Sequence, residues 1–118
     1  MYVRDLMTPR VIAVEPTDTL AFARRELREN RIHHLLVMEK SRVVGLLSYR
    51  DLIGRNESEP VSSVMSRDVV TVEPWATVRN AASMMLGRTH GCLPVMESGE
   101  CTGIITTTDL LRAVTAQK

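Results

Sequence analysis

An internal repeat limits the possible folds of this 118-residue chain more than any other feature. A shift of 58 positions, with no gap, places Val14-Glu15-Pro16 on Val72-Glu73-Pro74, and the same register holds through most of the chain. Self-similarity in one fixed register indicates two copies of one supersecondary unit. We therefore predict two tandem motifs, residues 1–57 and 58–118, that together form one domain.

Each copy has the pattern of a strand followed by a capped helix. The runs Val11–Val14 and Val69–Val72 are β-branched and end at Glu-Pro, where proline cannot donate the N–H that a central strand needs. Thr19 and Thr77 are the predicted N-caps of the helices that follow. Apolar residues then recur at helical spacing: Leu20, Ala23 and Leu27 with the flanking Phe22 in the first copy, and Val78, Ala81, Ala82, Met85 and Leu86 in the second.

A β-hairpin and a second helix complete each copy. The predicted hairpin strands are Leu35–Met38 with Val43–Leu47, and Leu93–Met96 with Cys101–Ile105. The last helices are expected to begin near Tyr49 and near Thr107. The predicted fold class is α/β (α+β), with two βαββα motifs packed sheet to sheet about a pseudo-twofold axis. Clefts between the motifs would then be the expected ligand sites.

One motif with chemical meaning occurs twice, where the last strand of each copy becomes a helix. The segments Gly45–Asp51 and Gly103–Asp109 share the pattern G-h-h-[ST]-x-x-D, in which h is an apolar residue. A carboxylate at this place can accept hydrogen bonds from both vicinal hydroxyls of a ribose, and the hydroxyl three residues earlier suits a phosphate oxygen near helix N-terminal amides. Ser48 and Thr106 can equally be N-caps, with the two aspartates favouring the helix dipole. The residues alone leave both interpretations open.

These motifs together resemble the CBS domain family. The resemblance rests on V-x-D-L-M-T at Val3–Thr8, on N-R-I-H-H-L-L-V at Asn30–Val37, on the G-h-h-[ST]-x-x-D segments, and on the matching motifs of the second copy. It implies a stand-alone CBS pair (Bateman module), a regulatory module without enzymatic activity. The ligand would be AMP, ADP, ATP or S-adenosylmethionine, held without any obligatory cofactor.

The resemblance also implies which residues line two sites, each drawing on both motifs. The first site would combine Ser48, Arg50 and Asp51 with Val69, Val70, His90, Gly91 and Cys92. The second would combine Thr106, Thr108 and Asp109 with Val11, Ile12, Ile32, His33 and His34, and Arg31 joins the two histidines as a candidate phosphate contact. Because Gly91 stands at the position equivalent to His33, the two sites need not bind alike, and we rank the second site first.

Other classes of function are disfavoured. The net charge is +1 with dispersed Lys and Arg, and aromatic residues make up only 3% of the chain, so we expect no nucleic-acid partner. Cys92 and Cys101 lack metal-ligand spacing, and we expect buried strand cysteines and no metal site. Neither a catalytic triad nor a phosphate-binding loop is recognisable, which argues against an enzyme. The absence of a signal peptide or long apolar run predicts a cytoplasmic protein with no membrane segment.

The sequence also predicts how the protein assembles. Apolar residues of the final helices, Leu52, Ile53, Leu110 and Leu111, are predicted to be exposed, and the resemblance implies a homodimer that meets through these helices. An effector enzyme or transporter would respond to the ligand. The alternative is a protein interaction or dimerisation module whose ligand clefts are vestigial.

Overall fold

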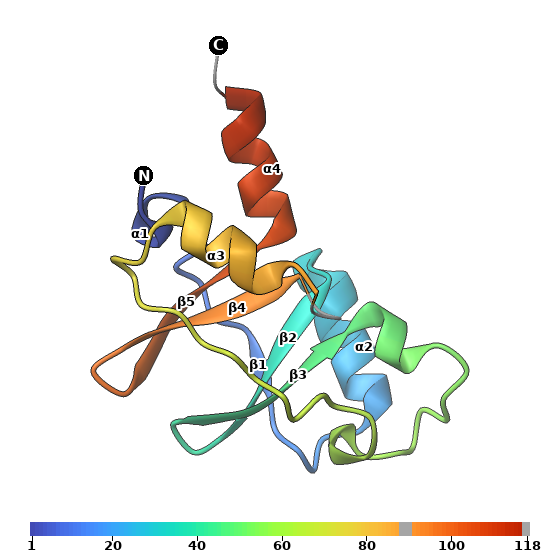
Figure 1. Cartoon of the computed structure of the whole chain (residues 1–118). Helices are drawn as coiled ribbons and strands as arrows, with labels where there is room; N and C mark the ends of the chain where they lie inside the picture. The colour runs from blue at the N-terminus through green and yellow to red at the C-terminus, as the bar shows by residue number, and fades with distance from the viewer. Residues whose placement is uncertain (88–90, 117–118) are drawn as a thin grey trace. The chain divides into compact units, whose positions relative to one another are not determined.

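The computed structural model describes residues 1–87 and 91–116, which form two compact units. The central unit is Ile12–Val69, and the terminal unit joins Met1–Val11 to Val70–Lys118. Both units contain helices and strands (Figure 1), so the predicted mixed α/β class is confirmed.

The central unit contains one three-stranded sheet with the strand order β1-β2-β3. Strand β1 runs parallel to β2, and β2 runs antiparallel to β3. The elements are β1 (Ala13–Val14), α2 (Leu20–Asn30), β2 (His34–Glu39), β3 (Arg42–Ser48) and the 3₁₀ helices η1 (Tyr49–Leu52) and η2 (Val61–Ser63). Helix α2 buries Leu20, Ala23 and Leu27 in a core that it shares with the buried side chains of the sheet, as its spacing predicts.

The terminal unit has a two-stranded antiparallel sheet. Its elements are α1 (Val3–Leu6), α3 (Val78–Met85), β4 (Cys92–Glu97), β5 (Glu100–Thr106) and α4 (Thr107–Ala116). A single parallel bridge from Val72 to Val95 stands where the central unit has β1. Both predicted hairpins are therefore confirmed, and the third strand of this unit is reduced to one bridge.

The predicted strands Val11–Val14 and Val69–Val72 are too long. Only Ala13–Val14 forms a strand in the first case, and only Val72 pairs in the second. The reason lies in the path of the chain, which leaves one unit and enters the other between Val11 and Ile12 and again between Val69 and Val70. The first half of each β-branched run therefore serves as a crossing, and only its end reaches the sheet.

Both predicted helix caps are confirmed. The Thr19 hydroxyl accepts a hydrogen bond from the Phe22 N–H at 3.2 Å, and the Thr77 hydroxyl accepts one from the Asn80 N–H at 3.1 Å. Leu86 was wrongly predicted to lie on the buried face of α3. It follows the last helical residue and is 80% exposed, because the chain becomes extended at Leu86 before Gly87 adopts a positive φ.

The final helices differ between the copies. The first is only a four-residue 3₁₀ helix, whereas α4 has ten residues. Gly54, with φ of 74°, stands where the second copy has Arg112, and glycine is a poor helix former. The predicted exposure is confirmed for Ile53 and Leu111, whereas it is wrong for Leu52, which is fully buried against α2 and its neighbours, and for Leu110, which is half-buried on the terminal core.

The opening segment of each repeat packs in the unit built mainly from the other repeat. The Val3 N–H donates to the Ala76 carbonyl at 2.8 Å, and the Val61 N–H donates to the Asp18 carbonyl at 2.7 Å. Val3 and Val61 are 58 positions apart and both fully buried. Burial of a valine side chain contributes about 1.5–3 kcal/mol, so this exchange stabilises both units.

A second contact of each opening segment adds it to the edge of a hairpin. Thr8 forms an antiparallel bridge with Ile104 of β5, and Ser66 forms the equivalent bridge with Leu46 of β3. The N–H to carbonyl distances are 2.9 Å for Thr8 to Ile104 and 2.8 Å for Ser66 to Leu46. Each hairpin thereby gains a backbone partner that its own repeat does not supply.

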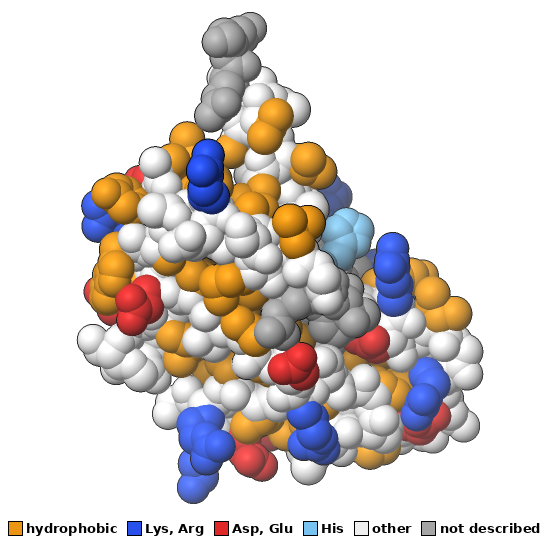
Figure 2. Space-filling view, viewed as in Figure 1, with side chains coloured by type: hydrophobic (Ala, Val, Ile, Leu, Met, Phe, Trp, Pro, Cys, Tyr) orange, Lys and Arg blue, Asp and Glu red, His pale blue; other side chains and the backbone are white. Residues whose placement is uncertain are grey.

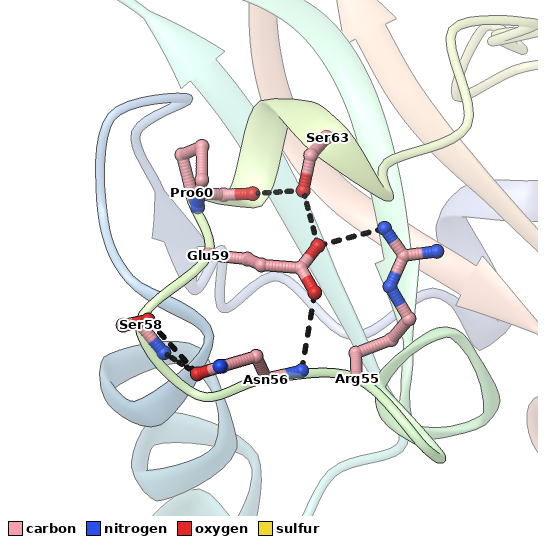
Figure 3. A network of polar contacts seen from close by, with 6 residues as sticks. All are labelled: Arg55, Asn56, Ser58, Glu59, Pro60 and Ser63. Atoms are coloured by element: carbon pink, nitrogen blue, oxygen red, sulfur yellow. Dashed lines mark hydrogen bonds and ion pairs between the residues drawn. The ribbon is translucent and has the colours of Figure 1, made fainter.

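Glu59 organises the linker between the repeats (Figure 3). Its carboxylate accepts hydrogen bonds from Arg55 Nη2 at 2.7 Å, from the Ser63 hydroxyl at 3.1 Å and from the Asn56 N–H at 3.1 Å. The bonds from Arg55 and Asn56 hold the pKa of Glu59 below its usual value. The Glu59 carbonyl also accepts the N–H of Leu20 at 2.9 Å, so the linker supplies an acceptor to the first turn of α2.

Two equivalent glycines allow the opening segments to approach, and they predict unequal effects of alanine. A Cβ at Gly103 would lie 2.6 Å from the backbone carbonyl oxygen of Thr8, whereas a Cβ at Gly45 would first meet the flexible Met65 thioether at 2.7 Å. We expect Gly103→Ala to destabilise the protein by about 1–3 kcal/mol and Gly45→Ala by less, because a methionine side chain can move where a backbone cannot.

Urea unfolding monitored by circular dichroism measures both changes. Alanine also makes the unfolded chain less flexible than glycine does, which raises the stability of both variants. This effect is the same for both, so it cancels when the two free energies of unfolding are compared. Equal losses, or a larger loss for Gly45→Ala, would contradict the assignment of the close approach to the backbone of Thr8.

Candidate functional site

Each copy of the G-h-h-[ST]-x-x-D motif folds into what we call a hydroxyl–carboxylate corner. In the central corner, Asp51 Oδ2 accepts hydrogen bonds from the Ser48 N–H at 2.8 Å and the Ser48 hydroxyl at 3.2 Å. In the terminal corner, Asp109 Oδ2 accepts from the Thr106 N–H at 2.9 Å and the Thr106 hydroxyl at 3.2 Å. The two corners therefore have the same internal geometry.

The corners are helix caps as well as candidate binding groups. The Asp109 N–H donates to Thr106 Oγ1 at 3.3 Å, which completes a reciprocal capping box at the start of α4. Ser48 and Asp51 make a capping box at η1. The structural interpretation of the motif is thus correct, and it does not exclude binding, because a cap fixes the orientation of its carboxylate and hydroxyl in advance.

Burial gives the corners unusual chemistry for surface motifs. Asp109 is 7% exposed and Ser48 is 8% exposed, while Asp51 and Thr106 are half-buried. A carboxylate removed from water forms strong charge-assisted hydrogen bonds to any donor that reaches it. A donor that reached Asp109 would therefore be held more firmly than by an exposed aspartate.

The segment Ile32–His34 lies beside the central corner. His34 is the direct ladder partner of Ser48 across β2 and β3, and the Tyr49 N–H donates to the His33 carbonyl at 3.1 Å. His33 and Arg31 are exposed, and Ile32 and His34 are half-buried. The family resemblance implies that Ile32–His34 lies at the Asp109 site; these residues belong to two different units, and their grouping stays a prediction.

The segment that ends at Cys92 lies beside the terminal corner in the same way. Cys92 is the ladder partner of Thr106, and the Gly91 carbonyl accepts the Thr107 N–H at 2.9 Å and the Thr107 hydroxyl at 3.3 Å. A Cβ at Gly91 would collide with Thr107 Oγ1. Thr107 is not among the residues predicted from the sequence, although one signal is present there: the copy that has a glycine in place of His33 also has a threonine in place of Tyr49.

The remaining candidate residues are distributed over both units. Arg50 and Thr108 are exposed at the second position of their helices. Ile12 and Val69 belong to the central unit and Val11 and Val70 to the terminal unit, and all four are half-buried. The Ile12 carbonyl accepts the Leu36 N–H at 3.2 Å, so one of the backbone groups expected to face a ligand already has a partner. His90 lies outside the described residues.

Both cysteines are free thiols on the β4–β5 hairpin. Burial raises the pKa of Cys92 to about 12, and the negative charge of Asp109 adds to this effect. Burial also raises the pKa of Cys101, while hydrogen bonds to the Gly103 and Val95 carbonyls act in the opposite direction. Cys92 thus places a neutral group next to the terminal corner.

Thiol reactivity tests this environment. In a Cys101→Ser variant at pH 8, Cys92 should react with iodoacetamide roughly 10³- to 10⁴-fold more slowly than a free thiol, because its thiolate fraction is that small. Adding Asp109→Asn should increase the rate, since it removes a charge that disfavours the thiolate. A rate near that of a free thiol, in protein shown to be folded by circular dichroism, would contradict the assigned burial.

The fold and the two corners define a class: a tandem α/β repeat with one partly buried hydroxyl–carboxylate pair per repeat. The family model for the CBS domain matches residues 3–57 and again residues 61–116. The chain therefore belongs to the CBS domain family, as the sequence motifs indicated.

Known relatives differ in length and context. An uncharacterised 17.7 kDa protein of Acidianus ambivalens is 33% identical over 118 residues, which are 95% of this chain and 72% of that protein. The magnesium transporter MgtE of Thermus thermophilus is 34% identical over 119 residues, which cover 95% of this chain but only 26% of the transporter.

A solved structure shares the fold across the whole chain. The CBS domain pair of protein MJ0100, in complex with 5′-methylthioadenosine and S-adenosyl-L-methionine, has a TM-score of 0.91 at 23% identity and covers 100% of this chain and 98% of its own. In this chain, none of the helices among the described residues is long and apolar enough to cross a membrane.

Proposed function

We propose that the chain is a regulatory module that binds an adenosine-containing ligand through its hydroxyl–carboxylate corners and does not catalyse a reaction. The observation that carries the proposal is the pair of equivalent, partly buried corners, Ser48 with Asp51 and Thr106 with Asp109, made of the same hydrogen bonds. Family membership supports it, and so does the related CBS pair that holds two adenosyl compounds.

The chemistry of the corner fits a ribose. In the terminal corner the bonds within the cap use Oδ2 of Asp109, and a carboxylate has several further lone pairs for the two vicinal hydroxyls. The neighbouring hydroxyl of Ser48 or Thr106 is placed to meet a second polar group of the ligand. The adenine would lie between aliphatic side chains. AMP, ADP, ATP and S-adenosylmethionine all present the diol that this corner would bind.

Asp109→Ala tests the binding role. The variant should bind AMP or S-adenosylmethionine about 100-fold more weakly at the terminal corner, because two charge-assisted hydrogen bonds of about 2–3 kcal/mol in total are lost. Isothermal titration calorimetry measures this change. The loss of stability should stay near 1 kcal/mol, as for other helix caps.

Asp5→Ala is a matched control in the same unit. Asp5 Oδ2 accepts the Tyr2 N–H at 2.7 Å, so this variant also removes a capping carboxylate. Asp5 does not belong to either G-h-h-[ST]-x-x-D motif. It should lose a similar amount of stability and no affinity. If the wild-type protein binds no adenosyl compound and Asp109→Ala only lowers the melting temperature, the corners are caps and the proposal fails.

An interaction module with vestigial clefts is the second candidate, and exposed apolar residues favour it. In α4, Leu111 is 61% exposed and Val114 is 66% exposed, and Figure 2 shows hydrophobic side chains on the surface of this helix. We propose that this face forms a homodimer and that an effector enzyme or transporter in the cytoplasm responds to the ligand-bound module. The dimer and the ligand sites can both be present.

Leu111→Glu tests the dimer. The introduced charge should convert a dimer to a monomer in multi-angle light scattering at micromolar protein concentration, because a buried unpaired carboxylate is costly. Ala116→Glu, on the exposed opposite side of α4, should leave the dimer intact. A wild-type monomer at this concentration would refute the dimer without affecting the ligand proposal.

A further inference from the structure

The helices that follow the two corners are supported in different ways. In the terminal unit, α4 continues to Ala116, so the Leu110 carbonyl lies inside a regular helix, where the N–H four residues later is its partner. In the central unit, η1 ends at Leu52, the residue equivalent to Leu110, and the chain turns away at Gly54 with a φ of 74°. The central corner therefore needs a support other than a continuous helix.

Arg24 of α2 supplies this support at the end of η1. Its Nη2 donates to the Leu52 carbonyl at 3.3 Å, beside the 3.2 Å hydrogen bond that the Arg55 N–H makes to the same oxygen. A single turn of 3₁₀ helix has poorer hydrogen-bond geometry than an α-helix and is not stable by itself. Arg24 thus fastens the last residue of η1 to a longer helix whose apolar face lies in the central core.

The linker holds the guanidinium of Arg24 in turn. Arg24 Nε is buried and lies 3.3 Å from Glu57 Oε1, as an ion pair without hydrogen-bond geometry. The Glu57 side chain is 63% exposed, so this pair adds little to the stability of the fold. A buried positive group nevertheless needs a partner, and Glu57 provides the negative charge.

The second repeat carries different residues at these positions. A shift of 58 positions places Arg24 on Ala82 and Glu57 on Thr115. An alanine side chain has no donor for a carbonyl, and threonine has no charge. The repeat therefore keeps the corner and changes its support, which is a ten-residue helix in one copy and a contact from one arginine in the other.

Asp51 directly precedes Leu52, so Arg24 holds the residue next to the corner carboxylate. Building on the proposed function, we infer that Arg24 is the positioning residue of the central corner. It keeps Asp51 where the carboxylate accepts both hydroxyls of a ribose, and Glu57 keeps Arg24 in place. Arg24 acts through Asp51 and does not contact the ligand. A change in the linker between the repeats can thus reach the central ligand site through two side chains.

The preference for a diol measures this positioning. An Asp109→Ala background keeps the central corner, and calorimetry with AMP and with 2′-deoxy-AMP gives the ratio of the two affinities there. Partial unfolding lowers both affinities by the same factor, so the ratio reports the geometry of the site. We expect the ratio to be about tenfold, the value of one charge-assisted hydrogen bond, and to fall to about twofold or less when Arg24→Ala is added.

Three further measurements complete the test. Glu57→Ala removes the partner of Arg24 from an exposed position, so it should fold even if Arg24→Ala does not, and it should lower the ratio by a smaller factor. Arg28→Ala is the charge-matched control, because it removes an exposed arginine one turn further along α2, and it should leave the ratio unchanged. In an Asp51→Ala background, which keeps the terminal corner, Arg24→Ala should also leave the ratio unchanged.

The outcomes separate this inference from the proposed function. If Arg24→Ala leaves the ratio unchanged at the central corner, or lowers it equally at the terminal corner, the inference is wrong while ligand binding stands. An unchanged ratio in Glu57→Ala contradicts the role of the linker, and it contradicts the whole inference if Arg24→Ala does not fold. If the wild-type protein binds no adenosyl compound, the proposed function and the inference both fail.

Discussion

The exchange of opening segments is the contact on which the rest of the molecule depends. Val3 and Val61 are fully buried, and each donates a backbone hydrogen bond to the segment that precedes a helix of the other repeat. Thr8 and Ser66 then extend that contact to the edges of β5 and β3. Neither repeat completes a compact unit from its own residues. A single copy would leave a hairpin edge and an apolar face exposed, and the second copy covers both.

The exchange of opening segments also explains why a glycine precedes each hydroxyl–carboxylate corner. Gly45 and Gly103 stand where the opening segments cross the strands that lead into the corners, and a Cβ at either position would meet another segment at less than 3.0 Å. Each corner therefore begins three residues after a position of close approach. A strand held in this way positions the hydroxyl of Ser48 or Thr106 through packing, and the capping hydrogen bonds then orient the aspartate.

Sequence periodicity predicted the elements whose stability is local. The hairpins, the caps at Thr19 and Thr77, and the buried face of α2 follow from residues within a few positions of one another, and all are confirmed. One error, at Leu86, has a local cause in the turn at Gly87, and the others concern residues whose surroundings come from distant segments. Leu52 is buried through contacts that the helical pattern does not contain, and Val11 and Val69 stand where the chain crosses between units.

The sequence by itself determined that the chain is a duplicated α/β module of the CBS family with a hydroxyl and a carboxylate at fixed spacing in each copy. A repeat can be recognised by comparing the sequence with itself, and caps and hairpins depend on residues that are only a few positions apart. Only the tertiary structure decided that the repeats exchange their opening segments, that Asp109 is almost fully buried, and that His34 and Cys92 stand opposite the corner hydroxyls. Those features arise from strand register and from packing between distant residues, which no local pattern specifies.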